Sequence, residues 1–361
     1  MPYPEQATGF QVDSAETWKT PTKRSFPLKP FGDYDVDIKV EACGICYSDI
    51  HTISGGWGAQ NFPICVGHEI VGTAVRVGNR VTKIKQGERV GQGAQCFSCG
   101  ECKQCKHGNE NYCPVIKIDT YGDKYPGTDV TSSGGYANYT RAHENWVFPI
   151  PDGLKSEYAG PMLCAGLTSY SPLVRNGCGP GKKVGILGIG GIGHFGLIFA
   201  KALGAEVWAI SRSRAKEADA KKLGADGFIA TSEKDWEVPH KFSFDVVINT
   251  SSSYENFDLA KYLSMMDVHG KFISVGLPEE EGIVIKAQDL IPNGVSLSTS
   301  HIGNREEAFQ MLKLAADKKL EPWIENVEIN QKNLEDALQR MAKNDVRYRF
   351  CLVGHEKEFP E

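Results

Sequence analysis

The chain has 361 residues and a mass of 39.6 kDa, a length typical of about two domains at roughly 150 residues each. With 41% hydrophobic and 24% charged residues, its composition excludes a disordered, collagenous or coiled-coil chain. The net charge is -5 and no basic block is present to bind a phosphate backbone, so we expect no nucleic-acid partner.

The first residues lack the charged and apolar regions of a signal peptide. The most apolar window, residues 184–200, contains six glycines and a histidine and is shorter than the roughly 20 residues that cross a bilayer. We therefore expect no membrane association and a cytoplasmic location. In such a reducing compartment, eleven cysteines favour metal binding over disulfide bonds.

Short β-type runs come first, at residues 35–41, 69–77 and 135–141, and predict a β-rich region with long loops. Strands at 183–187, 206–211, 228–230, 244–249 and 271–275 then alternate with helices at 192–203, 214–223 and 257–266. This alternation predicts a parallel, doubly wound sheet. Asn304 and Glu307 have the spacing of a capping box before a helix, and apolar residues at 334, 337, 338 and 341 predict a last helix.

The fold class is therefore α/β, with a β-rich domain beside a doubly wound one. We place the β-rich domain at 1–151 and the doubly wound domain at 152–298. Residues 299–361 are predicted to return to the first domain.

A glycine fingerprint lies between the strand at 183–187 and the helix that follows. Its G-x-G-x-x-G pattern consists of Gly188, Gly190, Gly191, Ile192 and Gly193 with Ile189. In this context Gly188 allows the tight turn, Gly190 lets backbone approach a pyrophosphate, and Gly193 lets the helix pack on the strand. The pattern predicts dinucleotide binding, against the alternative of a packing turn without a ligand.

Cofactor choice is indicated at the end of the next strand, where NAD sites place an acidic residue. Here the chain has Ser211 and Arg212, with Arg214 and Lys216 close behind. No carboxylate repels a 2′-phosphate, and hydroxyl and guanidinium donors can bind one. We predict NADP; the alternative is an exposed basic helix start without a ligand.

Four cysteines follow one another at short, regular intervals: Cys99, Cys102, Cys105 and Cys113. Four thiolates on one loop suit a closed, structural zinc site. Cys96 lies just before this regular spacing and is the expected spare.

A second set of metal-binding residue types is dispersed: Cys46, His68 and Cys164. Two thiolates and one imidazole would leave one position of a zinc ion open. Distance along the chain does not unite them, and taken singly each could be a core residue.

The chain resembles the zinc-containing medium-chain alcohol dehydrogenases along essentially its whole length. The resemblance is to the cinnamyl alcohol dehydrogenase branch, in particular the NADP-dependent alcohol dehydrogenases of fungi. It rests on CGICYSDIH, VGHEIVG, the four-cysteine loop, LCAGLTSYSPL, GIGGIGHFGLIFAKALGAEV followed by SRSR, and DVRYRF. It implies a GroES-like catalytic domain, a Rossmann domain, a catalytic zinc on Cys46, His68 and Cys164, two zinc ions per chain and a homodimer.

The resemblance also implies residue roles. Ser48 would take the proton of the zinc-bound alcohol and pass it through the cofactor ribose toward His51. Glu69 would be an alternative zinc ligand or a carboxylate behind the ligands, and Asp49 would orient a liganding imidazole. Tyr47 departs from many relatives, which have His or Gly there, so a pyrophosphate contact from this position is not implied. The remaining cofactor contacts implied are Thr168, Val275, Leu277, Ser298, Ser300, Ile302 and, near the phosphates, Arg349.

The function implied is the interconversion of small primary alcohols and aldehydes, aromatic or medium-chain aliphatic, by hydride transfer with NADP(H). Trp57 and Phe62 could line an apolar pocket for the substrate or belong to the core. One alternative is a polyol dehydrogenase, which would suit a polar pocket and NAD. Another is a binding protein that lost catalysis, which the presence of every implied zinc ligand and relay residue disfavours.

Overall fold

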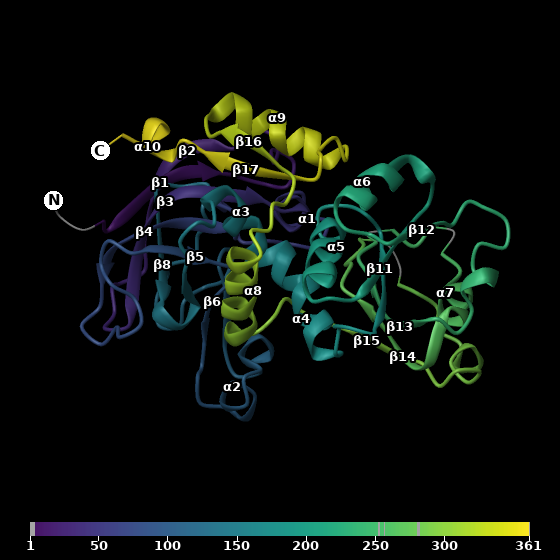
Figure 1. Ribbon diagram of the computed structural model, residues 1–361. Helices are drawn as coiled ribbons and strands as arrows, with labels where there is room; N and C mark the ends of the chain where they lie inside the picture. Colours follow the sequence, from purple (N-terminus) through teal and green to yellow (C-terminus); the bar gives the residue numbers. More distant parts are fainter. Residues whose placement is uncertain (1–3, 252, 256, 280–281, 361) are drawn as a thin grey trace. The chain divides into compact units, whose positions relative to one another are not determined.

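The computed structural model describes residues 4–251, 253–255, 257–279 and 282–360. The chain divides into two compact units (Figure 1). The first unit comprises the chain up to Cys164 together with the residues from Asn304 onward, and the second is Ala165–Gly303. Both boundaries fall later than the predicted ones at 151 and 298.

The first unit is built on a mainly antiparallel sheet with strand order β16-β17-β3-β4-β5-β9, and β8 pairs with the other end of β3. A separate hairpin joins β1 (Gln6–Gln11) and β2 (Thr22–Pro27). The strands of the sheet are β3 (Asp35–Ile45), β4 (Ile70–Val77), β5 (Arg89–Gln92), β8 (Tyr139–His143), β9 (Val147–Pro149), β16 (Ile324–Glu328) and β17 (Arg349–Val353).

The strand predicted at 135–141 is wrong in its first half. The backbone N–H groups of residues 134–136 donate to carbonyls of residues 65–67, outside the regular sheet, and β8 begins only at Tyr139. Pairing with an irregular segment is a long-range property that local alternation does not reveal.

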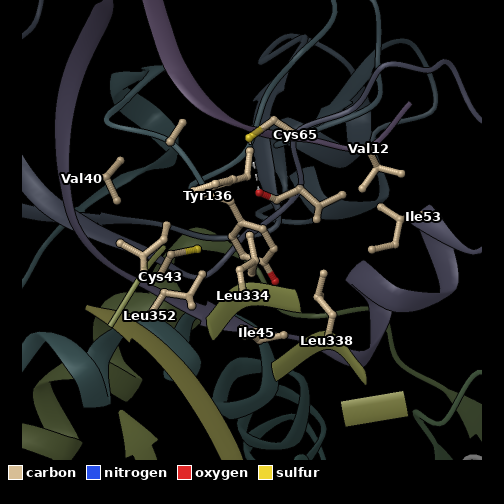
Figure 2. Packing of buried hydrophobic residues seen from close by; sticks show 14 of the residues in the cluster. Val12, Val40, Cys43, Ile45, Ile53, Cys65, Tyr136, Leu334, Leu338 and Leu352 are labelled. Atoms are coloured by element: carbon tan, nitrogen blue, oxygen red, sulfur yellow. Dashed lines mark hydrogen bonds between the residues drawn. The ribbon is translucent and has the colours of Figure 1, made fainter. Parts of the chain in front are cut away.

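Helices cover this sheet and close its core. Their bounds are α1 (Tyr47–Ile53), α2 (Lys103–Lys106), α3 (Ser156–Pro161), α8 (Arg305–Asp317), α9 (Gln331–Ala342) and α10 (His355–Glu358). The predicted apolar stripe of α9 is confirmed, because Leu334, Leu338 and Met341 are buried in a hydrophobic cluster of the first unit. Figure 2 shows Leu334 and Leu338 beside Tyr136 and Ile45 in that cluster.

The chain re-enters the first unit at α8, whose capping box of Asn304 and Glu307 is confirmed. The start of α8 is bound to the loop that carries the four cysteines. Asn304 donates from Nδ2 to the carbonyl of Gly108 at 2.6 Å, and Arg305 donates from its backbone N and its Nε to Oε1 of Glu110 at 2.8 and 3.0 Å.

The second unit contains the predicted parallel, doubly wound sheet, with strand order β12-β11-β10-β13-β14-β15. Its strands are β10 (Lys183–Leu187), β11 (Glu206–Ser211), β12 (Gly227–Ala230), β13 (Phe244–Asn249), β14 (Met266–Ser274) and β15 (Ser296–Thr299). Its helices are α4 (Leu167–Arg175), α5 (Gly193–Ala202), α6 (Glu217–Lys222) and α7 (Leu259–Ser264).

Two predicted helices are shorter in the structure. Residues 214–216 form a 3-10 turn before α6, and α7 ends at Ser264 because β14 already begins at Met266. Within the part of the chain that the structure describes, no helix combines the length and the apolar character that a membrane crossing requires.

Stability is expected to depend on pH through His355 in α10. This side chain is 1% exposed, its Nε2 lies 3.1 Å from the Gly135 carbonyl, and its Nδ1 has no hydrogen-bond partner among the described residues. Burial lowers the pKa of His355 to about 4. A depressed pKa means that the folded state prefers the neutral ring, so this stabilisation is complete above the unfolded pKa of about 6.5 and is lost as the pH falls toward 4.

At about 1.36 kcal/mol per pKa unit, the advantage of the wild type over His355→Gln should shrink by about 2 kcal/mol between pH 7 and pH 5. Urea unfolding of both proteins at the two pH values measures this. A difference in stability that does not change with pH would contradict it.

Candidate active site

The dispersed cysteines and histidine lie together in the first unit. Cys46 directly precedes α1, His68 lies just before β4, and Cys164 is carried by a π-helical turn, η3 (Met162–Gly166). The Nε2 atom of His68 lies 3.1 Å from Sγ of Cys164, and the two sulfurs are 3.9 Å apart. Ligand atoms of these three residues and of Glu69 all lie within 4.8 Å of one another, and all four side chains are buried. π-Helical turns are rare and frequent at functional sites.

The imidazole of His68 is oriented by its other nitrogen. Nδ1 lies 3.3 Å from Oδ1 of Asp49 and 3.0 Å from the hydroxyl of Tyr121. Nε2 therefore faces the sulfurs, which is the arrangement of a metal-binding histidine with a supporting carboxylate.

Asp49 is itself fixed and fully buried. Its carboxylate accepts from the backbone N of Cys46 at 2.9 Å, the backbone N of Gly67 at 3.3 Å and the hydroxyl of Tyr136 at 2.9 Å. Tyr121 and Tyr136 are site residues that the sequence did not point to. They lie on loops without a motif, and only the folded arrangement brings them to Asp49 and His68.

Glu69 forms a buried ion pair with Arg349 through Oε1. Its other oxygen, Oε2, is buried without a hydrogen-bond partner among the described residues. Burial raises the pKa of Glu69 to about 8, although Arg349 acts in the opposite direction. A Cβ atom at Gly44 would lie 1.9 Å from Oε2, so the carboxylate occupies space that only glycine leaves open. A contact of Arg349 with a cofactor phosphate stays a prediction.

The electrostatics suit a cation. Because the Cys164 thiol contacts the Cys46 sulfur, the pKa of Cys46 is lowered well below its ordinary value, while that of Cys164 is raised. Burial disfavours a charged His68, but Asp49 outweighs it and raises the pKa of the imidazole. A buried group of two sulfurs, one imidazole nitrogen and one unpartnered carboxylate oxygen fits a zinc ion.

The two predicted relay residues lie on α1. The Oγ atom of Ser48 is 3.5 Å from Sγ of Cys46, and His51 lies one turn further along the helix. The sequence that follows Cys46 thus places a hydroxyl beside the candidate metal cluster and a histidine one helical turn further along.

The four cysteines of the predicted structural site also form one cluster. Ligand atoms of Cys99, Cys102, Cys105 and Cys113 lie within 4.8 Å of one another. Backbone N–H groups support the thiolates: burial raises the pKa of Cys113, but hydrogen bonds from Ile116 and other N–H groups outweigh this and lower it to about 6. Cys96 lies outside the cluster, buried against the carbonyl of Asp119 and the hydroxyl of Tyr125.

The glycine fingerprint lies at the carboxyl end of β10 in the second unit. Gly188 has φ +86°, a Cβ at Gly193 would lie 1.8 Å from the Gly188 carbonyl oxygen, and a Cβ at Gly190 would meet nothing within 4 Å. The tight turn and the close packing of helix on strand are thus present, and Gly190 leaves open space. Strand order reverses between β10 and β13, which is where such sheets bind ligands.

Most of the other predicted cofactor residues of this unit lie at the same edge of the sheet, at or after the carboxyl ends of its strands. Ser211 ends β11, Val275 and Leu277 follow β14, Ser298 lies in β15, and Ser300 and Ile302 follow it, whereas Thr168 is buried in α4. Thr250, which the sequence did not point to, follows β13 and donates to the carbonyls of Leu187 and Gly188. Polar residues after a parallel strand are the signal that could have found it.

Near Ser211, the basic side chains have different surroundings. Arg214 is paired with Glu233 at 2.6 Å and Glu217 at 2.9 Å. Lys216 donates to the carbonyl of Ile189, inside the glycine turn, at 2.7 Å. Ser211 and Arg212 therefore stay the predicted 2′-phosphate ligands, with Lys216 beside them.

A two-unit fold with two candidate metal sites is the architecture of zinc-binding dehydrogenases with a GroES-like and a Rossmann-type unit, and family models match both parts of the chain. The chain matches the alcohol dehydrogenase GroES-like domain over residues 32–152 and the zinc-binding dehydrogenase family over 191–317. It is 48% identical to NADP-dependent alcohol dehydrogenase 6 of Saccharomyces cerevisiae, with 100% of each chain covered.

Solved structures agree. A cinnamyl alcohol dehydrogenase of Sorghum bicolor matches with TM-score 0.90 at 34% identity, over 96% of this chain and 97% of that one. A Helicobacter pylori protein named CAD, solved with NADP(H), matches with TM-score 0.88 at 31% identity, over 98% of this chain and 99% of that one. The chain belongs to the zinc-containing medium-chain alcohol dehydrogenases, in the cinnamyl alcohol dehydrogenase branch.

Proposed function

We propose that the protein is a zinc-dependent alcohol dehydrogenase that interconverts primary alcohols and aldehydes with NADP(H). The observation that carries this is the buried cluster of Cys46, His68 and Cys164, with Ser48 beside it. Relatives named as NADP-dependent and cinnamyl alcohol dehydrogenases support it. We further propose two zinc ions per chain, one at each cluster.

Zinc bound at the first cluster would act as a Lewis acid, stabilising an alkoxide or polarising a carbonyl oxygen. The chain's own residues prepare this site. Asp49 fixes the ring of His68, and Arg349 holds one oxygen of Glu69 while the other oxygen lies unpartnered beside the ligand atoms. Ser48 is the proposed first acceptor of the alcohol proton, and His51 a later one.

Cofactor preference should reverse on Ser211→Asp. One charge-assisted hydrogen bond to a 2′-phosphate is worth roughly 10- to 150-fold, so the wild type should strongly prefer NADPH. An aspartate at 211 would accept from both ribose hydroxyls of NAD and repel the phosphate. The measurement is kcat/KM for NADPH and NADH in each protein.

Ser211→Ala is the matched control, because it removes the hydroxyl without adding charge. It should weaken NADPH use without improving NADH use. Equal kcat/KM for both cofactors in the wild type would show that residues 211–216 are only an exposed helix start.

The proposed substrates are aromatic or medium-chain aliphatic primary alcohols and their aldehydes. The test is the oxidation of NADPH with benzaldehyde or cinnamaldehyde, with hexanal, and with sugar carbonyls. The aromatic aldehydes and hexanal should react. A protein that reduces only sugar carbonyls would be a polyol dehydrogenase instead.

We also propose a cytoplasmic homodimer. Support for the dimer comes from β15, an edge strand of the second unit whose backbone can pair with another chain. Nearby, Val284, Ile285 and Ile291 are 78%, 55% and 75% exposed, an apolar surface suited to a second copy. Light scattering gives the mass in solution. Eleven free cysteines support a reducing compartment.

A further inference from the structure

The relay histidine, His51, is enclosed by two aromatic side chains. The indole of Trp57 stacks on the imidazole with ring centroids 4.7 Å apart and planes 18° from parallel. Tyr47 meets the same ring edge-on, at 4.6 Å and 61°. His51 itself is only 7% exposed.

A turn after α1 brings Trp57 back to His51. After α1 ends at Ile53, Gly55 adopts φ +77°, a conformation that favours glycine, and the backbone N of Trp57 donates to the carbonyl of His51 at 3.3 Å. Trp57 is thus tied to His51 by both its backbone and its ring. Trp57 remains 40% exposed.

Proton transfer requires a base whose nitrogen is held in one place. Ser48 and His51 share one short helix, which fixes the Cα of His51 but does not by itself set the orientation of its ring about χ2. A parallel stack on one face and an edge contact from Tyr47 restrict that turning.

We propose that Trp57 is a positioning residue of the proton relay, holding the His51 ring in the orientation that accepts the proton. This rests on the proposed function, because it gives Trp57 a role only if His51 is in the relay. It differs from the idea that Trp57 lines the substrate pocket, which predicts effects that depend on substrate size.

The experiment is a double-mutant cycle with Trp57→Leu and His51→Gln, measuring kcat and KM for a small and an aromatic alcohol. An aromatic contact of this kind corresponds to about 2- to 12-fold, so Trp57→Leu should lower kcat by about that factor for both alcohols with little change in KM. In the His51→Gln background it should have no further effect. Trp57→Phe keeps an aromatic ring at this position and should restore most of the rate.

A readout without turnover is the NMR shift of the His51 ring protons. The stacked indole should move them upfield, and Trp57→Leu should remove that shift. An equal loss of kcat with and without His51, or ring protons unmoved by Trp57→Leu, would overturn the role of Trp57 while leaving the relay intact. Normal turnover of His51→Gln would instead show that the relay itself is wrong, and the positioning role with it.

Discussion

Replacing Cys46 by Ser is expected to lower kcat/KM by at least about 10³-fold. Loss of a Lewis acid that supplies roughly 4 kcal/mol of transition-state stabilisation corresponds to that factor. The fold should survive, because Cys46 is the N-cap of α1 and serine is a favourable N-cap residue. Elemental analysis should find two zinc ions in the wild type and one in the variant.

Two further variants make this specific. Cys102→Ser removes a ligand of the other cluster, so we expect loss of one zinc and a melting temperature lower by roughly 5 °C or more, with catalysis retained by the folded fraction. Cys178→Ser changes a cysteine outside both clusters and should keep both metals and full activity. One zinc per wild-type chain, with Cys102→Ser unaffected in stability, would refute the assignment of two sites.

Ser48→Ala should lower the rate of alcohol oxidation by about 10²- to 10⁴-fold, the usual contribution of a general acid–base group. Its hydroxyl lies 3.5 Å from the Cys46 sulfur, but structural and catalytic zinc sites are built from Cys, His, Asp and Glu, so the zinc content should not change. Steady-state rates over a range of pH and zinc analysis of the same sample test both statements.

Ser54→Ala, at the other end of α1, is the matched control and should keep wild-type rates, because Ser54 is only the C-cap residue of that helix. Near-normal turnover and an unchanged pH profile in Ser48→Ala would remove Ser48 from the relay.

Local patterns predicted much of the molecule. The glycine turn and the four-cysteine cluster each lie within a short stretch, so spacing alone was informative. The parallel sheet was predictable because its strands and helices alternate along the chain. The first metal cluster was different: Cys46 and Cys164 are far apart in the chain, and only the resemblance united them with His68 before the structure did.

The contacts that hold that cluster in place could not be predicted from the sequence. Tyr136 reaches Asp49 because residues 134–136 run beside residues 65–67, and this is the same pairing that made the predicted strand at 135–141 wrong. Arg349 was expected near cofactor phosphates, but its ion pair with Glu69 depends on β17 lying against β3. Such contacts follow from topology, which no local window contains.

The position of β17 has a consequence for how the protein is made. β17 pairs with β16 and β3, yet it is synthesised after the second unit, which is one continuous segment already complete by Gly303. Because domains fold as units during synthesis, the Rossmann-type unit is expected to fold while the GroES-like unit still lacks β16 and β17. The cation that pairs with Glu69 arrives only with Arg349, so the first candidate metal cluster is completed only after the second unit has been synthesised. A nascent or truncated chain would hold cofactor-binding structure without a finished catalytic centre.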